Sequence, residues 1–364
     1  MGAEGLPRLR RPAIRRPLNR LSAPYVIGGA LACLVAGWLI SKAIGDFGQF
    51  LTVTLNGLTL AALFFVVASG FTLIFGLMRT INMAHGSLYL LGGYVAFEIQ
   101  ESWFAKDTGE FNLSISQGAG DADFSVFGWV VPLLVAALAM GLLGLLIYQV
   151  LLRWNQGQEL RQALITIAIV IIAADQMLAH FGGVAKDIKP PSEWPTSVDL
   201  PLASGDFAFF RLTIVLGSAL AIGGLLWLMI KKTRFGLMTR AGVDDRDMVA
   251  ALGINIPLIF AGVFFLGAFL AGFGGVLGGT MLSLQPGEDT SLLLTSLVVV
   301  IIGGMGSLGG AAIGALALGL VQAYAGAFLT FGSTDLTNYS ILLTFLLVVA
   351  VLAVRPYGLF GRPA

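Results

Sequence analysis

Long apolar runs separated by short polar segments make up most of this chain. A helix needs about 20 apolar residues to cross a bilayer, and ten runs approach or exceed that length. They lie at residues 25–44, 51–75, 84–100, 128–151, 163–181, 212–230, 257–282, 291–304, 311–330 and 338–354. The run 291–304 is too short to cross unaided, so we expect it to form a broken or re-entrant element with the glycine-rich segment 303–310. The pattern predicts an all-α, polytopic transmembrane helical bundle of about 10 spans.

These runs divide the chain into one membrane domain with two tails. We expect a basic tail at 1–24, a transmembrane domain at 25–356 and a short tail at 357–364. Three polar segments interrupt the membrane domain, at 101–127, 182–210 and 231–257. The first is acidic, and the second is rich in proline and so should be extended and ordered against its neighbours.

The distribution of basic residues predicts the orientation. With ten spans, both termini share one side of the membrane. If that side is the cytoplasm, 16 of the 21 Lys and Arg residues lie inside, which agrees with the excess of positive charge in cytoplasmic loops. We therefore expect both termini and segment 231–257 inside, and segments 101–127 and 182–210 outside.

The Arg-rich start followed by an apolar run also resembles a signal peptide. That run is long for a signal peptide and has no convincing A-x-A cleavage site, so we expect a retained first span at 25–44.

Composition agrees with a membrane protein. The chain is 57% apolar and 11% charged, whereas soluble domains carry roughly 25% charged residues. The single cysteine, Cys33, excludes a disulfide within the chain and a cysteine-cluster metal site. No metal, cofactor or nucleic-acid partner is expected.

The inside segment 231–257 contains "DDRDMVAALG", which predicts a short helix. Asp244 or Asp245 can cap its start, and Gly253 suits its end. Its apolar face would consist of Met248, Ala251 and Leu252. Such a helix either docks into a groove of another protein or lies on lipid headgroups.

An energy source for transport is not evident in the chain. A phosphate-binding P-loop ends in Gly-Lys-Ser/Thr, and no lysine here follows a glycine. Three ways to drive transport therefore remain: a partner that hydrolyses nucleotide, an ion gradient, or passive flow. A gradient-driven carrier needs ionisable groups within its spans, and Asp175 is the best candidate, although a structural carboxylate paired with Gln176 explains it as well.

Three segments resemble one family. They are "NGLTLAALFFVVASGFTLIFGLMRTINMAHGSLYLLGGYVA" (56–96), "TRFGLMTRAGVDDRDMVAALGINI" (233–256) and "VVVIIGGMGSLGGAAIGALALGL" (298–320). Together they resemble the LivH/LivM type of ABC-importer permease. The resemblance implies an inner-membrane permease for branched-chain amino acids or a similar small polar solute, which works by alternating access and is not itself an enzyme.

The same resemblance implies partners. Two cytosolic ABC ATPase subunits would drive the chain, a second permease subunit or a copy of itself would pair with it, and a periplasmic substrate-binding protein would deliver the solute. The inside helix then becomes the coupling element to the ATPase. Its candidate residues are Arg240, Asp244, Asp245, Arg246, Asp247, Met248, Ala251, Leu252 and Gly253.

Polar residues at the start of the run 84–100 are candidates for the translocation path. Broken helices in transporters present free N–H groups to anionic substrates, and irregular backbone at membrane depth needs polar partners. The hypothesis is that a path or gate includes Asn82, His85, Gly86, Ser87 and Asp175. The alternative is a structural turn that holds two spans together.

Glycines recur at every fourth position in two places, which predicts close helix packing. The residues concerned are Gly275 and Gly279, and Gly306, Gly310 and Gly314.

Two alternatives to the leading function stay open. One is a permease of the same kind for urea or short-chain amides. The other is a gradient-coupled carrier or channel that acts alone.

Overall fold

The computed structural model describes residues 37–78, 82–104, 124–155, 157–198, 207–244, 246–331, 334–335 and 340–361. The basic tail 1–24, most of the expected first span and most of the acidic segment 101–127 lie outside these residues. A helical stretch covers 37–45.

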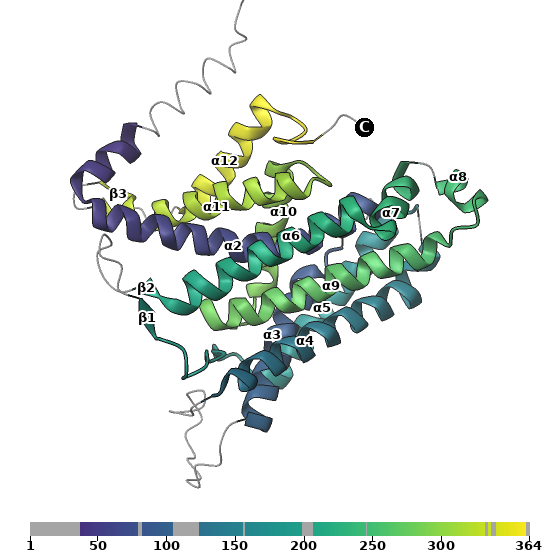
Figure 1. Ribbon diagram of the computed structural model, residues 1–364, viewed down its shortest axis with the longest axis horizontal. Helices are drawn as coiled ribbons and strands as arrows, with labels where there is room; N and C mark the ends of the chain where they lie inside the picture. Colours follow the sequence, from purple (N-terminus) through teal and green to yellow (C-terminus); the bar gives the residue numbers. More distant parts are fainter. Residues whose placement is uncertain are drawn as a thin grey trace, which may run out of the picture.

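The described residues form a bundle of long helices that lie side by side (Figure 1). The helices are α2 (Phe47–Met78), α3 (His85–Ile99), α4 (Val126–Ile147), α5 (Glu159–Phe181), α6 (Leu216–Lys232), α7 (Arg234–Asp244), α8 (Arg246–Ala251), α9 (Ile256–Met281), α10 (Glu288–Gly303), α11 (Leu308–Phe328) and α12 (Ser340–Val354). Wider π-helical turns extend three of them, at Gln100–Phe104, Tyr148–Leu152 and Phe210–Val215. Four short strands form two antiparallel pairs. In the first, β1 (Ser197–Val198) pairs with β2 (Phe207–Ala208), and in the second, β3 (Thr330–Phe331) pairs with β4 (Thr334–Asp335).

Every expected run from 51–75 onward coincides with a helix, so the mostly helical, polytopic character is confirmed. Six helices among the described residues are long and apolar enough to cross a membrane. They are Phe47–Met78, Val126–Asn155, Glu159–Phe181, Phe210–Lys232, Ile256–Met281 and Leu308–Phe328. The total of about ten spans and the cytoplasmic side of the termini stay predictions.

Helices α2 and α9 form the centre of the bundle. In their most apolar stretches 72% and 61% of the residues are buried, against 11% in α5 and 17% in the helix that ends at Lys232. The outer helices therefore keep apolar side chains on the surface, as expected where lipid is the solvent.

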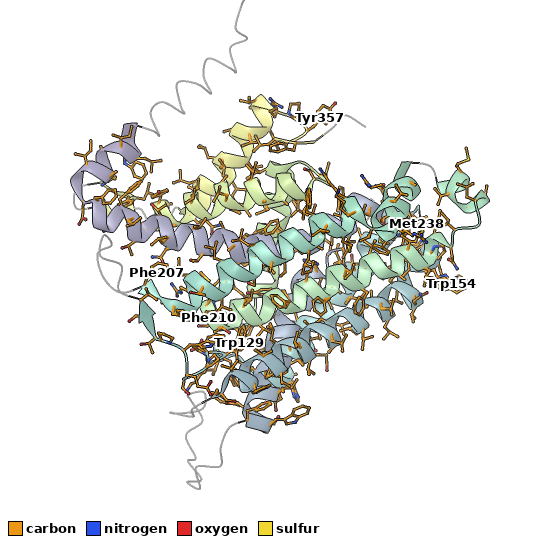
Figure 2. All side chains as sticks on the ribbon, in the orientation of Figure 1. Trp129, Trp154, Phe207, Phe210, Met238 and Tyr357 are labelled. Atoms are coloured by element: carbon orange, nitrogen blue, oxygen red, sulfur yellow. The ribbon has the colours of Figure 1, made fainter. Side chains whose placement is uncertain are left out.

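Large aromatic side chains lie towards both ends of the bundle (Figure 2). Trp129, Phe207 and Phe210 lie towards one end, and Trp154 and Met238 towards the other. The rings of Trp129 and Phe210 are 5.5 Å apart and nearly perpendicular. Aromatic clusters of this kind are typical of a membrane–water interface.

The proline-rich segment 182–198 is extended and packed onto the bundle, as its sequence predicts. Lys186 and Leu284 exchange two backbone hydrogen bonds of 2.9 and 2.7 Å. The Ile188 N–H donates to the carbonyl of Gly279 over 3.0 Å, and its side chain is buried. This segment therefore fixes the end of α9 and the turn that leads into α10.

Candidate functional site

Two short helices, α3 and α10, meet at their N-terminal ends inside the bundle. The Ser87 hydroxyl donates to Oδ2 of Asp289 over 3.3 Å, and both side chains are buried. A β-carbon at Gly86 would overlap the backbone oxygen of Asp289, so only glycine permits this approach. Asp289 lies in the first turn of α10, where its negative charge interacts favourably with the positive end of the helix dipole.

The turn before α3 is closed by Asn82. Its Oδ1 accepts from the N–H of Ala84 over 3.2 Å, and its own carbonyl accepts from the N–H of His85. The Met83 N–H donates to Oγ1 of Thr166 on α5 over 3.2 Å. These contacts satisfy backbone groups that the helix break leaves free.

His85 is fully buried between α2 and α3. Its Nε2 lies 3.0 Å from the carbonyl oxygen of Val67, so this nitrogen carries the hydrogen. The ring also meets the edge of Phe71 at 5.6 Å between centroids. Among the described residues, His85 Nδ1 and Asn82 Nδ2 have no hydrogen-bond partner.

Replacing His85 with alanine is expected to destabilise the protein, because the change opens a cavity and removes the side-chain hydrogen bond to the Val67 carbonyl. We expect a loss of about 2–4 kcal/mol, seen as a lower thermal midpoint of the detergent-solubilised protein. An unchanged midpoint combined with lost uptake would contradict this and support a direct role in the path.

A first cavity lies beside this junction and contains two carboxylates. It has a volume of about 310 Å³, with Asp175 from α5 and Asp289 from α10 in its lining. Asp175 is exposed, and the Gln176 amide donates to its Oδ2 over 3.4 Å. The remaining lining residues are Leu90, Ala174, Met177, Leu178, Pro286 and Gly287.

A second cavity, here named the polar pocket, lies between α2, α10, α11 and α12. It has a volume of about 390 Å³, which is within the range of small-ligand sites. Its polar lining comprises Glu288, Ser291, Thr295, Gln322 and Thr344. Its apolar lining comprises Leu60, Phe64, Leu282, Leu292 and Ala323. The sequence analysis did not select any of these polar residues.

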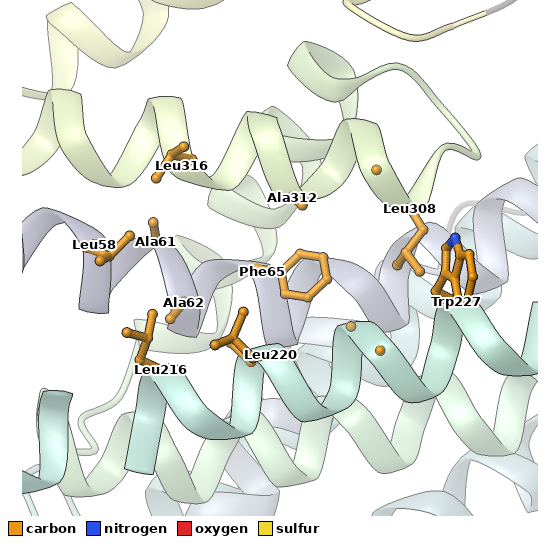
Figure 3. Close-up of a pocket in the computed structure, with 14 residues that line it drawn as sticks. Leu58, Ala61, Ala62, Phe65, Leu216, Leu220, Trp227, Leu308, Ala312 and Leu316 are labelled. Atoms are coloured by element: carbon orange, nitrogen blue, oxygen red, sulfur yellow. The ribbon is translucent and has the colours of Figure 1, made fainter. Parts of the chain in front are cut away.

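The third cavity is an apolar groove of about 470 Å³ between α2, α6 and α11 (Figure 3). Phe65 of α2 lies at its floor, with Leu220 and Trp227 of α6 on one side and Leu308 of α11 on the other. Every residue in its lining is apolar. The groove therefore lacks the polar groups that a polar solute needs in place of its hydration shell.

Asn82, His85 and Ser87 line none of these three cavities. The three residues thus lie together at the start of α3, outside these three cavities. Asp175 is separate from this group and reaches it only through the cavity that it shares with Asp289.

Segment 231–257 contains two helices, α7 and α8, where the sequence predicted one. Asp244 is the last residue of α7 and its side chain is not among those described, and Asp245 lies outside the described residues, so the predicted cap stays a prediction. Gly253 has a left-handed backbone with φ of 81°, in line with its expected place after a helix end.

Two large apolar side chains of this segment are exposed. Met248 is 60% exposed and Leu252 72% exposed, whereas Val249 between them in sequence is buried. Ala251 and Arg240 are also exposed, and the Arg240 Nε donates to the carbonyl of Gly236. The side chains of Arg246 and Asp247 are not among those described.

The glycines selected for packing lie at close approaches between helices. Gly275 faces the backbone of Tyr89 on α3, and Gly279 faces Leu284. Gly310 and Gly314 face the backbone of α10, at Gly303 and Val299 respectively. Gly306 has φ of 80° and lies against Gly76 of α2.

Comparison with known proteins identifies a family. Residues 53–352 match the model of the branched-chain amino acid transport system / permease component family. The high-affinity branched-chain amino acid transport system permease protein LivH of Escherichia coli strain K12 is 28% identical over 325 residues, which cover 87% of this chain and 97% of that protein. The high-affinity branched-chain amino acid transport system permease protein BraD of Pseudomonas aeruginosa is 27% identical over 321 residues, which cover 86% of this chain and 97% of that protein.

A more distant relative is the probable branched-chain amino acid transport permease protein LivH of Methanocaldococcus jannaschii. It is 23% identical over 333 residues, which cover 89% of this chain and 96% of that protein. No solved structure matches the chain.

Proposed function

The chain belongs to the branched-chain amino acid transport system / permease component family, and on that premise we propose that it is the membrane subunit of an ATP-driven importer in a bacterial inner membrane. The family match spans most of the membrane domain and is the observation that carries the proposal. The family's members are transport components, which agrees with the resemblance found in the sequence. The proposed cargo is a branched-chain amino acid or a similar small zwitterion.

The proposed power source is a pair of cytosolic ATPase subunits that bind the segment 231–257. Two observations support this. The chain has no P-loop, and the exposed apolar side chains of Met248 and Leu252 offer a contact surface of the kind found at interfaces between proteins. A second permease subunit and a periplasmic binding protein complete the proposed assembly.

Competition for uptake tests the proposed cargo. Proteoliposomes that contain the assembled transporter and its binding protein are supplied with labelled L-leucine and an excess of L-isoleucine, urea or acetamide. We expect L-isoleucine to suppress uptake and the amides to leave it unchanged. Suppression by urea or acetamide alone would replace the proposed cargo with a short-chain amide.

A gradient-coupled carrier is the second candidate, and three acids that line cavities favour it. Glu288 and Asp289 add two carboxylates to Asp175, and ionisable groups within membrane bundles often carry protons. This candidate predicts that the permease alone takes up leucine when a proton gradient is imposed, without any ATPase. The ATP-driven proposal predicts no uptake under that condition.

A further inference from the structure

We propose that the polar pocket is where this permease contacts its solute, and that the solute is a small amphipathic molecule with an ammonium group. This inference rests on the proposed function and adds to it the residues in contact and the chemistry that they select.

The polar residues of α10 form one stripe along the helix. Glu288, Ser291 and Thr295 are spaced at i, i+3 and i+7, which places them on the same face. Ser291 is exposed, and Glu288 and Thr295 are partly exposed. Exposed polar groups on a membrane helix are costly against lipid, so this face is expected to border water or another subunit.

Two further helices turn polar groups towards the same stripe. Gln322 comes from α11 and Thr344 from α12. Thr344 is only 8% exposed, yet its hydroxyl has no hydrogen-bond partner among the described residues. A buried hydroxyl without a partner is rare in folded proteins, and one in the lining of a cavity can be satisfied by a water or by a solute that replaces that water.

The charge of the pocket points to a cation. Among the described residues that line the pocket, Glu288 is the only charged one, and none is lysine or arginine. A carboxylate in such a place is stabilised by a positively charged ligand group, while hydroxyl and amide groups beside it can hydrogen-bond a carboxylate or amide. An ammonium group near Glu288 therefore fits the pocket.

The opposite wall suits an alkyl side chain. Leu60 and Phe64 of α2 and Leu292 of α10 supply apolar surface within the same 390 Å³. A zwitterion with a branched alkyl side chain matches both walls, whereas urea has neither the charge nor the alkyl group. The apolar groove of Figure 3 offers only the second of these features.

Glu288→Gln in the complete transporter tests the charged contact. We expect the initial rate of L-leucine uptake to fall at least tenfold, with unchanged assembly of the transporter. The matched control is Glu98→Gln, since Glu98 is an exposed acid on α3 outside the pocket. We expect the control to transport like the wild type. Equal uptake by both variants and the wild type would overturn the inference.

Thr344→Val provides a variant that should fold normally, because valine has a similar shape and the lost hydroxyl has no protein partner. We expect a KM for L-leucine raised several-fold and an unchanged thermal midpoint. An unchanged KM would contradict a contact between Thr344 and the solute.

Thiol labelling tests whether the pocket holds water, and it does not depend on transport. Single cysteines at Ser291 and Thr295 are compared with one at Ile171, an exposed apolar position on α5, in a Cys33→Ala background. A membrane-impermeant, charged maleimide should label the first two, L-leucine delivered by its binding protein should protect them, and Ile171→Cys should stay unlabelled. Unlabelled cysteines at 291 and 295 would overturn the inference. If the wild-type assembly transports nothing, the proposed function fails, and labelling still decides whether the pocket is aqueous.

Discussion

Replacing Gly86 with alanine is expected to remove most of the folded permease from the membrane. The added methyl group would overlap the backbone oxygen of Asp289 and press on Leu293. Backbone atoms cannot move aside as a flexible side chain can, so the α3–α10 junction has to separate. We expect a loss of about 3 kcal/mol, seen as a lower thermal midpoint and a reduced yield of monodisperse protein.

The matched control is Gly326→Ala. Gly326 also lies within a helix, α11, but a methyl group there meets nothing within 4 Å. We expect this variant to be as stable as the wild type or slightly more stable, since alanine favours helix by about 1 kcal/mol over glycine. Equal midpoints for the two variants would show that α3 and α10 are not in contact at Gly86.

The double variant Met248→Asp, Leu252→Asp is expected to uncouple transport from ATP hydrolysis. These side chains are exposed large apolar groups between α7 and α9, and charged groups in an apolar interface cost several-fold in binding for each position. We expect ATP-driven uptake to fall by at least roughly tenfold, together with the amount of ATPase that co-purifies with the permease.

Leu160→Asp is the control for that double variant. Leu160 is 76% exposed at the start of α5, which the orientation rule also places on the inner side. Retained ATPase binding in this control and lost binding in the double variant would assign the contact to α8. If the ATPase still co-purifies with the double variant, the coupling surface lies elsewhere.

The helices could be predicted from apolar runs because lipid requires them, but the ends of the short helices could not. The predicted run begins at residue 291, where the apolar stretch starts, whereas α10 begins three residues earlier at Glu288. Acids that precede an apolar run are left out of it, yet the first turn of a helix and the wall of a cavity tolerate them. For this reason the apolar pattern does not reveal Glu288 and Asp289, two of the three carboxylates among the described residues that line the cavities.

The contacts of the polar residues predicted to form the path or gate also could not be predicted from the sequence. Asn82, His85 and Ser87 could be assigned to a helix break because polar groups interrupt the apolar pattern there. Nothing in their spacing shows that Ser87 meets Asp289, which is 202 residues away in the chain. Helix α7 was missed because "RFGLMTRAGVD" contains two glycines and a threonine, which are weak helix formers.

Uptake of labelled L-leucine by proteoliposomes tests the central claim most directly. The assembled transporter is compared with the permease alone, and ATP is compared with a non-hydrolysable analogue. The account predicts uptake only when the ATPase subunits and hydrolysable ATP are both present. Equal uptake by the isolated permease, continuing after ATP is exhausted, would contradict it.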